Sequence, residues 1–237
     1  IGTKNILRWA IKSGTKKIIY LSSVSVFGNN HEKNISESSK CMPVNIYGKT
    51  KYNAEKLVLD TCQKNNIQYL ILRPSNVIDI KSKNKYPLLE LIRSINNGYF
   101  FYFKNPKKVY LNYIIVENVV EIMKSSITLN NKSGIYILNN TIQLNKFVDL
   151  ISETLQIKTP KRVIPLVIGQ QVGILCDLFQ SILKIQIPFN SNRLLELTNE
   201  TQYKGDLVKK EILSNNNWDL NKVIKNLTIR YIKKGLI

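Results

Sequence analysis

The sequence is poor in the residues from which metal sites, disulfides and hydrolytic triads are built. Its one histidine, His31, stands alone in a polar stretch, so neither a histidine-based metal site nor a Ser-His-Asp triad can be assembled. The three cysteines, Cys41, Cys62 and Cys176, are odd in number and lack the spacing of metal or disulfide sites. Reduced thiols are typical of the cytoplasm, so we expect a cytoplasmic protein without a metal site.

Long apolar runs are also lacking. A membrane-spanning helix needs about 20 consecutive apolar residues, and the most apolar stretch, Val163 to Phe189, is interrupted by proline, glycine, glutamine, aspartate and lysine. We expect a core or lid helix there rather than a membrane span. No signal peptide is visible, but the chain starts at Ile1 rather than at methionine, and we expect it to be the later part of a longer protein.

Acidic residues are scarce beside basic ones, since 35 lysines and arginines against 16 aspartates and glutamates give a net charge of +19. Such a charge suits an anionic partner such as nucleic acid or a membrane surface. The lysines are scattered, however, and accompany many asparagines and isoleucines, which favours a biased coding composition. The two short basic clusters, 81–85 and 104–108, lack the interleaved aromatic residues of a single-strand-binding platform, so we expect no nucleic-acid partner.

The apolar pattern predicts alternating strands and helices. Buried strands are expected at Ile18–Ser22 and Gln68–Leu72, on either side of a helix from about Asn45 to Asn65. This order implies a right-handed crossover in a doubly wound parallel sheet covered on both faces. We expect Asn29–Pro43 to be a polar loop outside the core, and 99–103 to be a short strand or a pocket wall. Further strands are expected at 113–116 and 134–138, and helices at 3–13, 87–97, 119–126 (capped by Glu117 and Asn118), 144–155 and 223–234.

One stretch of the predicted helix suggests proton transfer. Tyr47 and Lys51 are four residues apart, so their side chains lie on the same helix face. The first strand ends in two hydroxyls, Ser22 and Ser23, at the edge where open α/β sheets carry their chemistry. A serine, a tyrosine and a lysine are together sufficient for a proton-transfer site.

Five blocks of sequence accompany these residues in order. They are Ile1–Leu7, Ser22–Gly28, the set Glu37, Pro43, Tyr47 and Lys51, then Arg73–Val77, and Val116–Val119. In this order and spacing they resemble the extended short-chain dehydrogenase/reductase superfamily, in its branch of NAD-dependent nucleotide-sugar epimerases and dehydratases. The tail, with Ile164–Pro165, Arg193–Thr198 and Asn217–Trp218, is similar to the branch found in surface-polysaccharide synthesis.

The resemblance implies an α/β protein with two parts. Residues 1–128 would be an incomplete NAD(P)-binding Rossmann-like domain, the C-terminal part of a doubly wound parallel sheet. Residues 129–237 would be a smaller, mostly helical substrate-binding region. The family's glycine-rich phosphate loop is not among these residues, so we expect the isolated chain to bind NAD weakly and to expose the strand edge beside Ile18–Leu21.

The resemblance also implies roles for the catalytic residues. Tyr47 would be the general acid/base, and Lys51 would lower its pKa from about 10 by roughly two to three units and hold the nicotinamide ribose. Ser23 would orient the sugar oxygen. Ser22 is the competing choice, and a serine that only caps a turn is the alternative.

Cofactor and substrate contacts follow in the same way. Ser22, Tyr47, Lys51, Pro74 and Ser75 would contact the cofactor, which is NAD, with NADP as the alternative. For the substrate, Asn76 would contact the nucleotide diphosphate and Ser23 would contact the sugar. Arg193 would be a second phosphate ligand, and the alternative is that it is an ordinary surface arginine. Relatives dimerise through the helix that carries the tyrosine and its neighbour, so we expect a homodimer.

Departures from the family pattern narrow the reaction. Val24 and Ser25 occupy positions that are often aspartate and glutamate in sugar dehydratases, which argues against dehydration. Leu111 stands where many relatives have an arginine that binds phosphate, and the nearby Lys107 and Lys108 could take over that contact. Residues 78–80 are Ile-Asp-Ile, where the family usually has Tyr-Gly-Pro. We therefore expect epimerisation or 4-keto reduction of a UDP-sugar. The alternatives are a reductase or dehydrogenase of another alcohol, such as a hydroxysteroid, and a non-catalytic or fragmentary relative that serves as a binding module.

Overall fold

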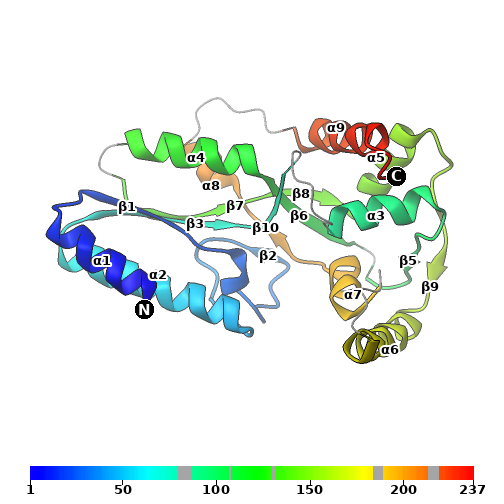
Figure 1. Cartoon of the computed structure of the whole chain (residues 1–237), viewed down its shortest axis with the longest axis horizontal. Helices are drawn as coiled ribbons and strands as arrows, with labels where there is room; N and C mark the ends of the chain where they lie inside the picture. Colours follow the sequence, from blue (N-terminus) through cyan, green and yellow to red (C-terminus); the bar gives the residue numbers. More distant parts are fainter. Residues whose placement is uncertain (80–86, 107, 130–131, 184–188, 213–218) are drawn as a thin grey trace. The chain divides into compact units, whose positions relative to one another are not determined.

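The computed structural model describes residues 1–79, 87–106, 108–129, 132–183, 189–212 and 219–237 (Figure 1). Three sets of residues used in the predictions above lie outside that description. They are Ile80 with the basic cluster 81–85, Lys107, and Asn217–Trp218. The chain forms two compact units, each built from separate stretches of sequence. Unit 1 comprises Ile1–Asp79, Asn112–Asn140 and Thr201–Trp218, and unit 2 comprises Ile80–Leu111, Thr141–Glu200 and Asp219–Ile237.

A parallel sheet forms the centre of unit 1. Its strands are β1 (Lys17–Leu21), β3 (Gln68–Pro74) and β7 (Gly134–Leu138), in the order β1-β3-β7. Helix α2 (Ile46–Lys64) connects β1 to β3. Figure 1 shows α1 (Gly2–Lys12) and α2 on one side of this sheet, and α4 (Val116–Thr128) and α8 (Asp206–Glu211) on the other. The expected doubly wound arrangement is confirmed.

Consecutive residues of the strands supply the cores on the two faces. Leu70 and Leu72 pack with Ile122 of α4, whereas Ile71 packs with Val58 of α2 and Leu7 of α1. All six side chains are buried. Because neighbouring strand residues point to opposite faces, a strand covered on both sides must be apolar throughout, which is the pattern from which it was predicted.

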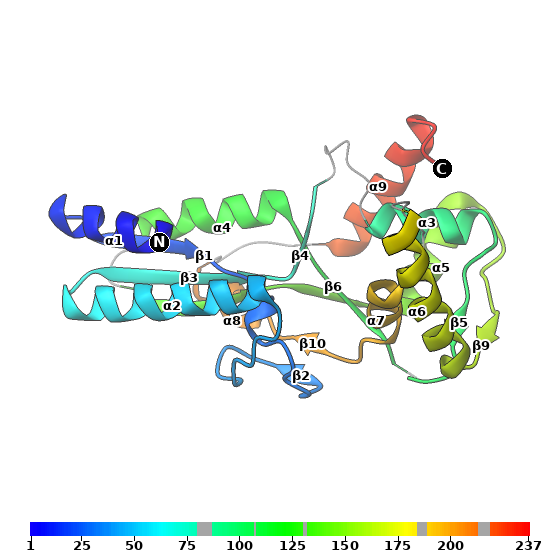
Figure 2. The same ribbon diagram turned by 60° about the horizontal axis from the view of Figure 1, so that its bottom comes forward.

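Two local predictions in unit 1 are wrong. Helix α4 begins at Val116, with Ile115 as its N-cap and no side-chain capping bond, so Glu117 and Asn118 lie inside the first turn. The loop 29–43 contains a short strand, β2 (Asn34–Ile35), and Ile35 is buried in the core beside Phe27. The partner of β2 is β10 (Gln202–Tyr203), which comes from much later in the chain and is therefore invisible to a local pattern (Figure 2).

The strand expected at 113–116 and the helices expected at 87–97, 144–155 and 223–234 are present with slightly different ends, whereas the strands Asn76–Ile78, Asn140–Gln143 and Val163–Ile164 were not predicted. Strand β4 (Asn76–Ile78) runs parallel to β6 (Tyr110–Ile115), with Asn76 opposite Tyr113 in unit 1. In unit 2, α5 (Leu144–Leu155) packs against α3 (Pro87–Asn96) and α9 (Leu220–Lys233). The other elements are β8 (Asn140–Gln143), β5 (Tyr102–Phe103), which pairs with β9 (Val163–Ile164), α6 (Leu166–Leu183) and α7 (Ser191–Thr198).

Helix α6 occupies the apolar stretch for which a core or lid helix was expected. The helix is present, but most of its bulky apolar side chains are exposed, so it is not a core helix. Within the described part of the chain, no helix is both long enough and apolar enough to cross a membrane.

Candidate functional site

The first turn of α2 packs closely against the turn that follows β1. The side chain of Asn45 caps the helix, with its Oδ1 accepting from the Gly48 N–H at 2.7 Å. A Cβ atom on Gly48 would lie 2.4 Å from the carbonyl oxygen of Ser25, in the short 3-10 helix Val24–Val26. The glycine therefore allows the helix that carries Tyr47 and Lys51 to approach the segment after Ser23.

Lys51 reaches from α2 to the carboxyl end of β1. Its Nζ donates to the Leu21 carbonyl oxygen at 2.7 Å. The same ammonium lies 5.8 Å from the ring centroid of Tyr47 and 5.4 Å from that of Tyr20. Tyr47 itself is 54% exposed, so its phenol is open to a ligand. The structure thus brings Tyr47 and Lys51 together at the edge of the sheet.

Tyr20 is a member of this group that sequence reasoning missed. It lies on β1 and packs toward α2 with Ile18 and Val58. Burial raises the pKa of the Tyr20 phenol, and the negative charge of Glu55 and the phenol of Tyr47 raise it further. The signal was present in the sequence, because Tyr20 and Ile18 are two residues apart on a strand and so share one face.

Two buried hydroxyls lie at the ends of neighbouring strands. The Ser22 N–H donates to the Leu72 carbonyl, and the Ser75 N–H donates to the Leu138 carbonyl. The hydroxyls of Ser22 and Ser75 are buried and have no hydrogen-bond partner within the described residues. Such an unsatisfied group costs about 1–3 kcal/mol, so a polar ligand at this edge would be stabilised. Both residues, and Pro74 at the end of β3, therefore fit the polar nicotinamide end of NAD.

Ser23 takes the turn-capping role that was its alternative in the sequence. Its Oγ accepts from the Ser25 N–H at 3.1 Å and donates to the Ser25 Oγ at 3.1 Å. It thereby caps the 3-10 helix, and the residue is buried. A sugar oxygen at this position would take the place of the Ser25 hydroxyl as the acceptor.

A buried ion pair beneath the site was also missed. The Arg73 Nε lies 3.0 Å from Glu55 Oε1 and its Nη2 lies 2.8 Å from Glu55 Oε2, with both side chains almost fully buried. Burial alone would lower the pKa of Arg73, but the hydrogen bonds and the charge of Glu55 raise it. Glu55 is one turn beyond Lys51, and Arg73 immediately precedes Pro74, so the pair joins the helix and the strand that carry the site. A charged residue on the inward face of α2, between Ala54 and Val58, was the available signal.

The two expected phosphate ligands lie in different units. Asn76 is exposed at the start of β4 in unit 1. Arg193 lies on α7 in unit 2, where its Nη1 is 2.7 Å from Glu196 Oε2. Arg193 is buried, so the alternative of a surface arginine is wrong.

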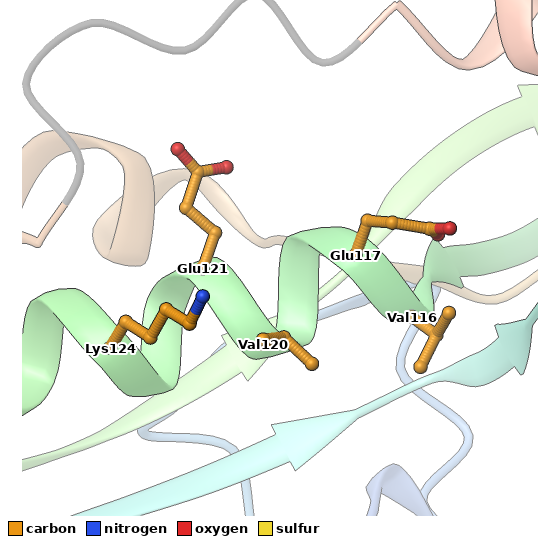
Figure 3. A pocket seen from close by; sticks show the side chains of 5 residues that line it. All are labelled: Val116, Glu117, Val120, Glu121 and Lys124. Carbon is orange, nitrogen blue, oxygen red and sulfur yellow. The ribbon is translucent and has the colours of Figure 1, made fainter.

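A shallow hollow of about 340 Å³ lies along α4 (Figure 3). It is lined by Val116, Glu117, Val120, Glu121 and Lys124, all from one helix. Its charges are of both signs, and none of the expected site residues lines it. It carries no site that we can assign.

Solved structures of known proteins share this fold. The UDP-glucuronic acid 4-epimerase from Bacillus cereus, in complex with NAD, superposes with a TM-score of 0.68 and 14% identity, over 99% of this chain and 67% of that chain. At this identity the likeness shows the fold alone.

Curated relatives are similar over different lengths. The N-acetyl-alpha-D-glucosaminyl-diphospho-ditrans,octacis-undecaprenol 4-epimerase of Escherichia coli O157:H7 is 27% identical over 213 residues, which is 87% of this chain and 63% of the relative. UDP-arabinose 4-epimerase 1 of Arabidopsis thaliana is 34% identical over 73 residues, 31% of this chain and 18% of the relative. The chain thus spans less than two thirds of the length of the relatives it matches.

The family model described as "NAD dependent epimerase/dehydratase family" matches residues 1–137, more than half of the chain. The matched stretch contains all of the sequence blocks up to Val116–Val119, and with them Ser23, Tyr47 and Lys51. The fold and the family match thus agree with the resemblance read from the sequence, and the chain belongs to the NAD-dependent epimerase/dehydratase family.

Proposed function

We propose that the whole protein is an NAD-dependent 4-epimerase of a sugar carried on a diphosphate. The observation that carries this proposal is the position of Lys51, which holds its charge beside the exposed phenol of Tyr47 at the strand ends where Ser22 and Ser75 present unsatisfied hydroxyls. The names of the Escherichia coli and Arabidopsis relatives both describe 4-epimerases, and they differ in the carrier, undecaprenol or UDP.

The chain's own residues would handle the proton and the sugar. Tyr47 takes the proton from the C4 hydroxyl in one direction and returns it to the C4 oxygen in the other. The positive charge of Lys51 favours the phenolate form that this requires. Ser23 orients the C4 oxygen, and Ser22, Pro74 and Ser75 contact the nicotinamide side. NAD, when bound, supplies hydride-accepting and hydride-donating chemistry at C4.

The segment after Ser23 supports epimerisation over dehydration. Val24 carries no ionisable group, and Ser25 is tied to Ser23 through both its N–H and its hydroxyl. Neither residue can act as the carboxylate acid or base that removal of water would need. 4-Keto reduction, which uses the same proton transfer but consumes the reduced cofactor, is the second candidate.

Substrate phosphates, assembly and location form part of the same proposal. Asn76 and Arg193 would contact the diphosphate, and a homodimer would form through α1 and α2. The exposed Ile6 and Trp9 on α1 support an interface there. The three cysteines are free thiols, which supports a cytoplasmic setting.

The test is turnover by the natural full-length chain on UDP-N-acetylglucosamine and on the same sugar linked to polyprenyl diphosphate. We expect conversion to the C4 epimer without net change in cofactor absorbance, whereas stoichiometric oxidation of NADH or NADPH would establish the reductase. Tyr47→Phe should lower kcat by at least about 100-fold, the usual worth of a general acid/base.

Tyr52→Phe provides the matched control. Tyr52 lies on the same helix, packed in the core beside Ile35 and stacked under Lys56, and should retain turnover. Near-normal turnover of the Tyr47→Phe protein would exclude the proposed mechanism.

A further inference from the structure

Helix α6 presents its small residues inward. A Cβ atom on Gly169 would lie 2.2 Å from the ring of Phe103, so this position has no room for a side chain. A Cβ atom on Gly173 would lie 3.4 Å from the Ser191 nitrogen, and the Asp177 carboxylate accepts from the Ser191 N–H at 3.4 Å. These three helix residues are four apart and form one stripe, along which α6 packs on α7 (Figure 1) and, at Gly169, against Phe103 of β5.

The bulky residues of α6 face outward. Eight apolar side chains are 41–66% exposed, and they are Val167, Ile168, Val172, Ile174, Leu175, Leu178, Phe179 and Ile182. In the sequence of this helix Asp177 is the only charged residue, and it belongs to the inner stripe. A helix that covers a protein core has the reverse arrangement, with its apolar stripe inward and charges outward. The helix that carries this face is 18 residues long, or about 27 Å.

Positive charge lies immediately before this face. Lys158, Lys161 and Arg162 line a hollow of about 580 Å³ together with Phe100 and Ile157, all in unit 2. Lys158, Lys161 and Arg162 are exposed. Basic side chains that precede an apolar helix face by a few residues in the sequence are complementary to anionic lipid, whose headgroups are negative and whose acyl chains are apolar.

We propose that the outer face of α6 docks on an anionic phospholipid surface, with Lys158, Lys161 and Arg162 meeting the headgroup phosphates. A second copy of the chain is the competing occupant. The net charge of +19 attracts the chain to a negative surface, and this favours the lipid.

If the protein is the proposed 4-epimerase, docking on lipid also indicates which carrier its substrate has. This step rests on the proposed function. A protein held at a lipid surface meets sugars whose diphosphate is carried by a lipid in that surface, as in the substrate that the Escherichia coli relative's name describes. Of the two carriers left open above, the polyprenyl diphosphate is therefore the one that α6 favours.

The experiment is co-sedimentation of the natural full-length chain with phospholipid vesicles. We expect at least tenfold tighter binding to vesicles of phosphatidylcholine with a quarter phosphatidylglycerol than to phosphatidylcholine alone, and weaker binding as salt is raised. Ile174→Gln with Leu178→Gln should reduce binding at least tenfold, and Lys158→Gln with Lys161→Gln should reduce binding and its salt dependence.

The matched control is Val120→Gln with Ile127→Gln, two exposed apolar residues of α4 in unit 1, which should bind like the unaltered chain. Circular dichroism and thermal unfolding check that each variant is folded. Tyr47→Phe should also bind vesicles normally, so a failure of the 4-epimerase proposal and a failure of docking give different results.

Two outcomes would overturn the docking. One is equal vesicle binding by the α6 variant and the unaltered chain, or no binding by either. The other is sedimentation velocity showing an assembly that the α6 variant makes smaller, which would assign the face to a second copy of the chain.

Discussion

At the scale of single residues, Lys51 is held in place without being neutralised. Its ammonium donates to a backbone carbonyl, that of Leu21, and lies near the ring of Tyr47. A carboxylate partner would cancel the charge, whereas a carbonyl only fixes its position. The charge therefore stays available to stabilise the phenolate of Tyr47.

This arrangement predicts a pH signature for Lys51→Met. Without the charge, a negative phenolate oxygen on Tyr47 lacks the cation that now lies beside its ring. We expect kcat/KM at pH 7 to fall at least about 100-fold and to recover part of the loss as the pH is raised toward 10. A pH profile of both proteins checks this, and a loss that is independent of pH would show that Lys51 acts only in binding.

The residues of the candidate site could be proposed from the sequence, but the residues that support them in the fold could not. Ser22, Ser23, Tyr47 and Lys51 lie at the ends of elements with strong local patterns. The partner of Glu55 lies 18 residues away on another element, and a buried ion pair leaves no period in the sequence. Likewise, the apolar pattern predicted that α6 is a helix but not which of its faces is buried, because that depends on the elements that pack against it.

At the scale of elements, the ion pair between Glu55 and Arg73 joins α2 to β3. Glu55→Ala would leave the Arg73 guanidinium buried without its carboxylate, and we expect a loss of about 3–5 kcal/mol in the free energy of unfolding. Urea unfolding measures this loss. Asp60→Ala, which breaks the exposed pair of Asp60 with Lys64 on the same helix, should cost less than about 1 kcal/mol. Equal losses would contradict the assignment.

The approach of α2 to the turn after β1 gives a second expectation. Gly48→Ala places a methyl group against the Ser25 carbonyl, and we expect it to destabilise the protein by about 1–3 kcal/mol and to lower turnover by shifting Tyr47. Gly2→Ala is the control, because Gly2 is also helical but has nothing within 4 Å of an added Cβ. Gly2→Ala should be neutral or stabilising. Thermal unfolding of both variants measures the two effects on stability.

At the scale of the whole molecule, charge governs the response to acid. The 16 carboxyl groups lose their charge as the pH falls, so the net charge rises above +19 and self-repulsion increases. Glu211 adds a specific contribution, because a hydrogen bond from Lys132, and then one from Tyr136, lower its pKa. A carboxyl with a lowered folded-state pKa stabilises the protein above its unfolded value and loses that effect as the pH falls through the folded value.

We therefore expect Glu211→Gln to lower the melting temperature at pH 7, and we expect the difference to shrink progressively as the pH falls below the ordinary glutamate value of about 4.3. Thermal unfolding of both proteins across this range, with 0.5 M salt to screen self-repulsion, measures the difference. A constant difference at every pH would mean that Glu211 contributes packing rather than charge.

The last segment of unit 1, Thr201–Trp218, is synthesised after most of unit 2, and this affects folding during biosynthesis. Strand β10 and helix α8 follow all of the central sheet in sequence, yet Val208 and Ile212 cover Leu138, and Gln202 pairs with Asn34. A chain emerging from the ribosome amino end first must therefore leave the part of this face that α8 covers, beside Leu138, exposed until residue 212 has appeared. Closing contacts across so long a loop is slow, so the nascent sheet is the natural client of a chaperone that shields apolar strands.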